Sequence, residues 1–197
     1  TAAGVCATYA SADVPKTMPG AAGSTTLSTI AIPGNPRVDD LQVAITLDHA
    51  NMQNLDVHLS SPAGNDNGLF TDIGGAAQPT MDLVLDDSAA IPIGAFNEVQ
   101  GMRLMPEADY LLGRYRGEDA GGTWTLSLRE DGSVAGGGTL TAWSITICEP
   151  PPPPSCPAGT FAATLFSTDF EAGESGFTHS GTLDEWELGL PSVAPIT

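Results

Sequence analysis

Acidic side chains are the groups in this sequence most able to do chemistry. Adjacent pairs occur at predicted strand ends or in turns, at Asp39-Asp40, Asp86-Asp87, Glu118-Asp119 and Glu130-Asp131. Calcium prefers about six to eight oxygen ligands and combines carboxylates with backbone carbonyls of loops. The acids therefore indicate either a calcium site or solvated turn residues of an acidic protein. An EF-hand is excluded because the run 65–68 lacks the later bidentate glutamate.

Nucleophilic catalysis finds no support in the sequence. It needs a nucleophile beside a base, and no Gly-x-Ser-x-Gly elbow occurs. The histidines are His49 near a predicted turn, His58 on the polar side of a strand, and His179 in the C-terminal part. We expect His49 to be a hydrogen-bonded structural residue. Zinc is disfavoured because His49 and His58 lack the short spacing of zinc ligands and no cysteine is near. The chain is predicted to be non-catalytic.

The composition excludes two classes of partner. The 197 residues include 24 acids and 6 bases, which gives a formal net charge of −18. Nucleic-acid binding needs clustered Lys and Arg, as does docking on an anionic membrane, and no stretch is apolar enough for membrane insertion. With 41% hydrophobic residues a core can form, while 23 glycines and 16 prolines favour an all-β protein with many turns.

Strands with period-2 alternation position the candidate residues. The alternation is present over 41–47, 55–59, 81–85 and 124–128. In segment 140–147 the apolar parity changes, which predicts a β-bulge near Ala142-Trp143. Turn residues separate the strands, at 33–36, 62–68, 131–132 and 136–138. No convincing helical period occurs, so the expected fold is a sandwich, jelly roll or barrel.

Two of the three tryptophans are expected in its core. Trp124 and Trp143 fall on the apolar parity of their strands. Trp186 is expected either in a core or on the stacking face of a glycan site.

The three cysteines, Cys6, Cys148 and Cys156, leave at least one without an internal partner. The proline tract 150–154 forms an extended rod, which would hold Cys148 and Cys156 on the order of 25 Å apart, too far for a disulfide. We expect a Cys6–Cys148 disulfide that ties the two ends of one domain together. The alternative is three free buried thiols.

Several patches, in this order, resemble the P domain, also called the Homo B domain. This module follows the catalytic domain of kexin- and furin-type proprotein convertases and is appended to many secreted bacterial proteases. The patches are 13–15, 30–34, 49–64, 84–89, 115–126 and 138–145. The most specific is 115–126, which resembles the family's Gly…Gly-x-Trp-x-Leu signature. Two departures are Gln53-Asn54-Leu55 in place of Gly-Asp-Leu, and Glu130 before the aspartate that is expected after the tryptophan strand.

The resemblance implies a jelly-roll β-sandwich of about eight antiparallel strands. It also implies a non-catalytic accessory module that supports the folding, stability or interactions of a neighbouring catalytic domain. The patches contain the candidate calcium ligands Asp86, Asp87, Glu118 and Asp119. Further contributors to that site are expected from Asp48, Asn54 and Asp56.

The domain organisation follows from the proline tract. We expect a P-domain-like jelly roll over 1–149, a proline-rich linker over 150–156, and the incomplete start of a second β module over 157–197. Segment 166–191 resembles the opening strands of MAM or lectin-like modules of secreted proteins. The chain is interpreted as a processed or excised piece of a secreted or cell-surface protein. The alternative function is an extracellular adhesion or carbohydrate-binding jelly-roll module.

Overall fold

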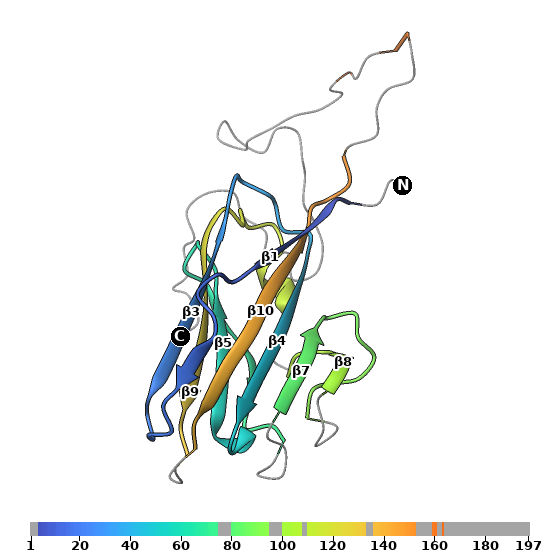
Figure 1. The fold of residues 1–197 in the computed structure, drawn as a ribbon. Coiled ribbons are helices and arrows are strands. Elements are labelled where there is room, and N and C mark those ends of the chain that lie inside the picture. The colour runs from blue at the N-terminus through green and yellow to red at the C-terminus, as the bar shows by residue number, and fades with distance from the viewer. Residues whose placement is uncertain are drawn as a thin grey trace, which may run out of the picture. The chain divides into compact units, whose positions relative to one another are not determined.

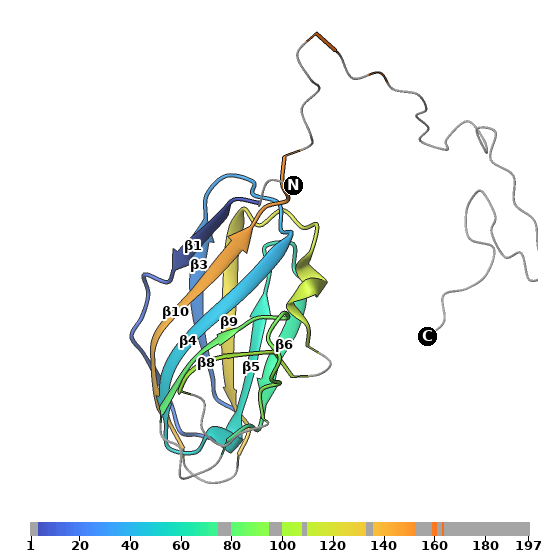
Figure 2. The same ribbon diagram turned by 90° about the vertical axis from the view of Figure 1, so that its right-hand side faces the viewer.

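Two β-sheets packed face to face form the described part of the chain (Figures 1 and 2). The structure is a computed structural model. It describes residues 4–74, 80–94, 100–107, 110–132, 136–152, 159–160 and 163. The predicted all-β sandwich is confirmed, and the described residues include two short 3-10 helices, η1 (Met52–Asn54) and η2 (Leu112–Tyr115).

The first sheet has the strand order β1-β10-β4-β7-β8, and β2 also pairs with β10. The strands are β1 (Cys6–Ala10), β2 (Lys16–Met18), β4 (Asp40–His49), β7 (Thr80–Leu85), β8 (Gln100–Leu104) and β10 (Gly138–Cys148). The second sheet has the order β3-β9-β5-β6. Its strands are β3 (Thr25–Ile32), β5 (Leu55–Ser60), β6 (Asp66–Thr71) and β9 (Gly122–Glu130).

The core lies between the sheets because period-2 strands bury every second side chain. In β4 the buried residues include Val43 and Ile45, and in β9 they include Trp124 and Leu126. The Trp124 ring packs edge-on against Tyr115, with ring centroids 5.1 Å apart. Trp143 is also buried and donates its indole N–H to Ser28 Oγ at 2.7 Å. Both tryptophans therefore lie in the core, as their parity predicts.

A β-bulge interrupts the pairing of β10 with β4. The register shifts between Leu140, opposite Leu47, and Ala142, opposite Thr46. Leu140 and Trp143 are both buried, although their parities differ. The bulge thus lies beside the predicted position and returns the apolar side chains of β10 to the core.

Two features of the sheets differ from the sequence-based expectation. Strand β8 pairs with β7 in parallel, so the sandwich is not antiparallel throughout. The turn predicted over 62–68 ends earlier, because β6 begins at Asp66. Gly68 fits inside that strand because the Tyr110 ring covers it; an added Cβ would lie 2.8 Å from Tyr110 Cε2.

Both edges of the second sheet are closed by side chains. Along β3, Lys16 Nζ donates to Leu27 O at 2.7 Å and Asp13 Oδ2 accepts from Thr29 N at 3.1 Å. Along β6, Glu107 Oε2 accepts from Thr71 N at 2.8 Å. These contacts use backbone groups that would otherwise be free to pair with another strand.

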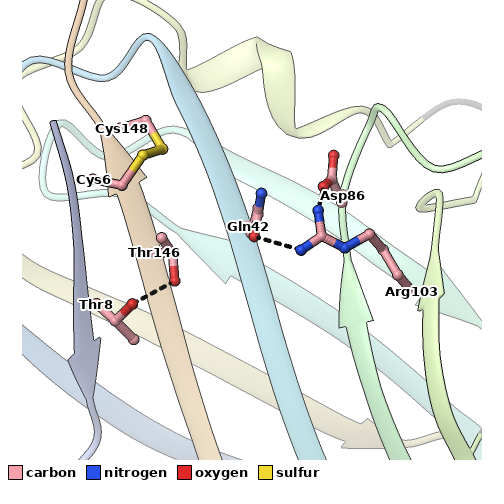
Figure 3. The surroundings of a disulfide bond; sticks show 7 residues. All are labelled: Cys6, Thr8, Gln42, Asp86, Arg103, Thr146 and Cys148. Carbon is pink, nitrogen blue, oxygen red and sulfur yellow. Dashed lines mark hydrogen bonds and ion pairs between the residues drawn. A yellow bond between two sulfur atoms is a disulfide. The ribbon is translucent and has the colours of Figure 1, made fainter. Parts of the chain in front are cut away.

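The ends of the first unit are joined at one sheet edge. Cys6 in β1 and Cys148 in β10 are register partners, and the structure links them by a disulfide (Figure 3). The chain divides into the units Thr1–Pro152 and Pro153–Thr197, and the boundary falls inside the proline tract. The predictions for Cys156, His179 and Trp186 lie outside the described residues. Of the helices in the described ranges, none has the length and apolar character needed to cross a membrane.

Candidate functional site

Asp87, a predicted calcium ligand, is an internal hydrogen-bond acceptor. Its Oδ1 accepts from Leu112 N at 2.8 Å and its Oδ2 accepts from Gly113 N at 2.6 Å. Both donors lie in the first turn of η2, where N–H groups lack partners within the helix. Asp87 therefore fixes η2 against the end of β7.

Asp86 is buried and engaged by a cation of the protein. Its Oδ1 accepts from Ser88 N at 2.7 Å, and its Oδ2 forms an ion pair with Arg103, which also contacts Gln42 at 3.4 Å (Figure 3). Burial raises the pKa of Asp86, but the hydrogen bonds from Ser88 and the charge of Arg103 outweigh this effect and the pKa is lowered. This carboxylate is already neutralised by Arg103.

Glu118 and Asp119 hold the loop before β9. Glu118 Oε1 accepts from Asn65 Nδ2 at 2.5 Å. Asp119 accepts from Asn35 Nδ2 at 2.6 Å and from Gly121 N at 2.8 Å. These two hydrogen bonds lower the pKa of the exposed Asp119. The second oxygen of Glu118, Oε2, is buried without a hydrogen-bond partner among the described residues.

The remaining predicted ligands lie near the C-terminal end of β4 and the N-terminal end of β5, which η1 connects. Asp48 is exposed near the C-terminal end of β4, in the first sheet. Asn54 is buried in η1, where its Oδ1 accepts from Asn51 Nδ2 at 3.1 Å. Asp56 in β5 is half-buried.

Asp56 belongs to a cluster of three carboxylates, the acidic triad Asp56, Asp72 and Asp131. One oxygen from each lies within 4.8 Å of the others, and this is the group of potential metal ligands found in the described residues. Backbone hydrogen bonds bring the three together: Asp72 N donates to Leu55 O at 3.1 Å, and Asp131 N donates to Asn54 O at 2.9 Å. Of the seven predicted ligands, Asp56 is a member of the triad.

The negative charge of the triad is not fully compensated. Burial and the charge of Asp131 raise the pKa of Asp56, although Arg129 Nη1 lies 3.3 Å from its Oδ2. Burial and the charges of Asp131, Asp56 and Glu107 likewise raise the pKa of Asp72. Carboxylate oxygens are the donors that a hard divalent cation such as calcium prefers. The donor set of the triad therefore fits calcium.

Asp72 and Asp131 were absent from the predicted ligand set for different reasons. Asp131 follows Glu130 in a turn where the P-domain resemblance expects an aspartate, but the sequence does not show which other side chains lie beside that turn. Asp72 follows β6, and that strand was obscured because Asp66, Asn67 and Gly68 are typical turn residues.

The two described histidines have defined partners. His49 Nδ1 lies 2.8 Å from Asn51 O, and its Nε2 lies 3.1 Å from Gly137 N and 2.8 Å from Glu130 Oε2. His49 is buried, and its contacts fit the expected structural role in the turn after β4. His58 Nδ1 lies 2.8 Å from Asp66 Oδ2, on the outer face of the second sheet.

Comparison with known proteins gives a remote structural likeness. No protein-family model and no curated protein matches the chain. The crystal structures that resemble it include the serine protease of Aeromonas sobria and the same protease in complex with its chaperone. Each has 20% sequence identity and a TM-score of 0.44, and the match covers 74% of this chain and 27% of the other. The chain thus spans about a quarter of those structures, and the likeness carries no functional argument.

Proposed function

We propose that residues 1–149 are a non-catalytic, P-domain-like accessory module of a secreted protein that stabilises a neighbouring catalytic domain. One observation carries this proposal: polar side chains in the patches that resemble the P domain are used to hold the sandwich together. Asp87 fixes η2, and the hydroxyl of Tyr115 donates to Leu59 O. Trp124 Nε1 donates to Ala120 O at 2.9 Å. The side chains of the motif thus build a scaffold.

The contacts of the two described histidines support a non-catalytic role. A hydrolase of the serine type needs an imidazole that takes the proton of the nucleophile. His49 is engaged by Asn51, Gly137 and Glu130, and the interactions of His58 run to Asp66. Ser60 Oγ also donates to Asp66, at 2.7 Å, instead of to His58.

The disulfide supports a secreted location. Disulfides persist in oxidising compartments and are rare in the cytosol. The link between Cys6 and Cys148 joins the first and last strands of the unit. An accessory module outside the cell would gain stability from it.

Deletion in the parent polypeptide tests the accessory role. Deletion of residues 1–149 from the parent polypeptide should lower the yield of folded, active neighbouring domain. Separately, the purified chain should not cleave a panel of unstructured peptides. Wild-type folding of the neighbour without the module would contradict the proposal, as would peptide cleavage that a single serine or histidine substitution removes.

We further propose that calcium binds this module at the acidic triad. The support is the convergence of three carboxylates and the raised pKa of Asp56 and Asp72, which a divalent cation would reverse. A cation that binds only the folded state stabilises it by about 2.7 kcal/mol at a hundredfold excess over Kd. The predicted ligands Asp87 and Asp119 are tested as alternatives; the carboxylate group found in the described residues does not include them.

Thermal unfolding distinguishes the triad from these alternatives. Calcium should raise the midpoint more than magnesium at equal ionic strength, and Asp131→Asn should remove the rise. If Asp87→Asn or Asp119→Asn removes it and Asp131→Asn does not, the site lies at that residue instead. Equal shifts with both metals would indicate general charge screening.

A further inference from the structure

A groove of about 500 Å³ crosses the outer face of the second sheet. Three rows of side chains from neighbouring strands form its floor. The middle row is Leu27, Ser127 and His58, which are register partners across β3, β9 and β5. One flanking row holds Arg129 and Asp56, and the other holds Thr125 and Ser60. Ser60 also pairs with Asp66 of β6.

The groove has a carboxylate at each end. Asp56 stands at one end and Asp66 at the other, while the cation lining it is Arg129. Arg129 Nη1 lies 3.3 Å from Asp56, but Asp72 and Asp131 surround that end with two further negative charges. The end at Asp56 therefore favours an added positive charge.

Asp66 is an oriented and accessible anion. Its Oδ1 accepts from Ser60 Oγ at 2.7 Å, and its Oδ2 lies 2.8 Å from His58 Nδ1. The Asp66 side chain is nevertheless 54% exposed. Burial raises its pKa, but the hydrogen bonds from Ser60 and His58 outweigh burial and lower the pKa. Asp66 is therefore ionised at neutral pH and has room to accept another donor.

The groove also offers apolar surface beside the charges. Leu27 is 53% exposed at the end of the middle row, which is a high exposure for a large apolar side chain. Arginine and lysine combine an apolar stem with a charged head, so they can pack on such a residue while the head pairs with a carboxylate. The hydroxyl groups of Ser127 and Thr125 between the two ends can accept further N–H donors.

A bound peptide would cross this face instead of extending the sheet. The edge of β3 is closed by Lys16 and Asp13, and the edge of β6 is closed by Glu107. Asp56 and Ser60 are four residues apart along β5, a distance of about 13 Å. The Asp66 carboxylate contacts His58, which lies midway between them along the strand. Arginines at alternate positions of an extended chain are about 7 Å apart, which suits this spacing.

We propose that this groove binds arginine or lysine side chains of an extended basic segment on a partner polypeptide. Charge complementarity selects this occupant, because carboxylates stand at both ends of the groove and the formal charge of the whole chain is −18. The inference does not depend on the accessory role. It shares Asp56 with the proposed calcium site, whereas Asp66 lies outside the acidic triad, so the two proposals can be tested separately.

Binding of a defined peptide to the full chain tests the proposal. The probe is a labelled, end-blocked Ser-Arg-Thr-Arg-Ser peptide, and its control carries citrulline, the uncharged isostere, at both arginines. In chelator at constant ionic strength, the arginine peptide should bind about tenfold more tightly than the citrulline peptide, and Asp66→Asn and Asp56→Asn should each weaken it about tenfold. Asp82→Asn is the matched control, since Asp82 is an exposed strand residue on the first sheet.

Several outcomes would overturn the proposal. Equal weakening by Asp66→Asn, Asp56→Asn and Asp82→Asn would mean diffuse attraction to an acidic protein. Equal affinity for the citrulline peptide would remove the role of charge. Binding of calcium without binding of the arginine peptide would leave a metal site alone. Binding of a neutral hexasaccharide such as cellohexaose, lost in Asp66→Asn, in place of the peptide would assign the groove to glycans. Thermal unfolding of each variant is the control that it remains folded at the assay temperature.

Discussion

The carboxylate of Asp13 joins several parts of the sandwich. Its Oδ1 accepts from Ser11 Oγ at 2.7 Å and from Ser28 Oγ, and its Oδ2 pairs with Lys16 Nζ at 2.9 Å and accepts from Thr29 N. Burial raises the pKa of Asp13, but the hydrogen bonds from Ser28, Lys16, Ser11 and Thr29 outweigh burial and hold the pKa well below its usual range. The N-terminal segment is thus fastened to the edge of β3.

Asp13→Asn should destabilise the fold at neutral pH. The folded pKa lies below the unfolded value of about 3.9, so the ionised carboxylate stabilises the fold above that pH. The stabilisation is lost as pH falls below about 4 toward the folded pKa. We expect a loss of about 1 to 3 kcal/mol in urea unfolding at pH 7. The difference between wild type and variant should narrow at pH 3 and below; a difference that does not change with pH would contradict this account.

The ionised carboxylate of Asp72 should destabilise the fold, whereas that of Asp13 stabilises it. The pKa of Asp72 is raised by burial and by neighbouring carboxylates, so ionisation opposes folding at neutral pH, and stability should rise as pH falls from neutral through the raised pKa. In chelator at pH 7, Asp72→Asn should stabilise the chain by a few tenths of a kcal/mol, since exposure screens the repulsion. Asn also tolerates the φ of 52° at this position.

The measurement is the thermal midpoint of Asp72→Asn and of the control Asp82→Asn at pH 7 and pH 3. The gain of Asp72→Asn should disappear at pH 3, where the wild-type carboxyl is protonated. An equal gain from Asp82→Asn would show that reduction of net charge, and not the triad, is responsible.

At the scale of elements, a buried pair connects the ends of β4 and β9 across the two sheets. His49 Nε2 and Glu130 Oε2 are 2.8 Å apart, and their side chains are 0% and 2% exposed. Gly136 leaves room for the pair, because an added Cβ would lie 2.7 Å from Glu130 Oε2 and 2.9 Å from His49 Cε1. The contact closes this end of the sandwich.

Removal of either partner should strongly destabilise the fold. A single substitution leaves the other polar group buried without this contact, which costs about 1 to 3 kcal/mol. His49→Ala, Glu130→Ala and the double variant should therefore show that the second substitution costs much less than the first in urea unfolding. Additive losses would mean that the two side chains act separately. Glu130→Gln keeps the shape and isolates the contribution of charge.

The strands were predictable from the sequence where burial alternates, and less so where local chemistry opposes it. Segments 41–47 and 124–128 have one buried face, so their period defines β4 and β9. Strand β6 escaped prediction because Gly68 is favoured there by the Tyr110 ring, a contact between distant parts of the chain. The parallel pairing of β8 depends on the path of the chain after β7, which periodicity does not describe.

At the scale of the whole molecule, the candidate sites depend on which loops the fold brings together. Asp56 lies at the start of β5, Asp72 follows β6 and Asp131 follows β9. No spacing in the sequence links these three residues. The acidic pairs that the sequence does emphasise are largely used as acceptors inside the domain, as with Asp87 on η2. A strand-end acid can therefore be recognised from sequence, but its use as a cap or as part of a cluster is decided by topology.

The closure of the whole unit rests on Cys6 and Cys148. They are separated by 142 residues and lie opposite each other in β1 and β10. Cys6 belongs to an edge strand that is largely exposed and has β10 as its strand partner, so few buried contacts hold β1 in place.

A covalent link of this span restricts the unfolded chain, and the chain-entropy model gives a stabilisation of about 3 to 5 kcal/mol. A non-reduced digest analysed by mass spectrometry should yield the Cys6–Cys148 peptide, and Cys6→Ser should lower the free energy of unfolding by that amount. Because β1 contributes little burial, the variant should keep the spectroscopic signature of the sandwich in the absence of denaturant. A Cys148–Cys156 peptide in the digest would contradict the pairing, and an unchanged unfolding curve for Cys6→Ser would show that the link does not constrain the unfolded state.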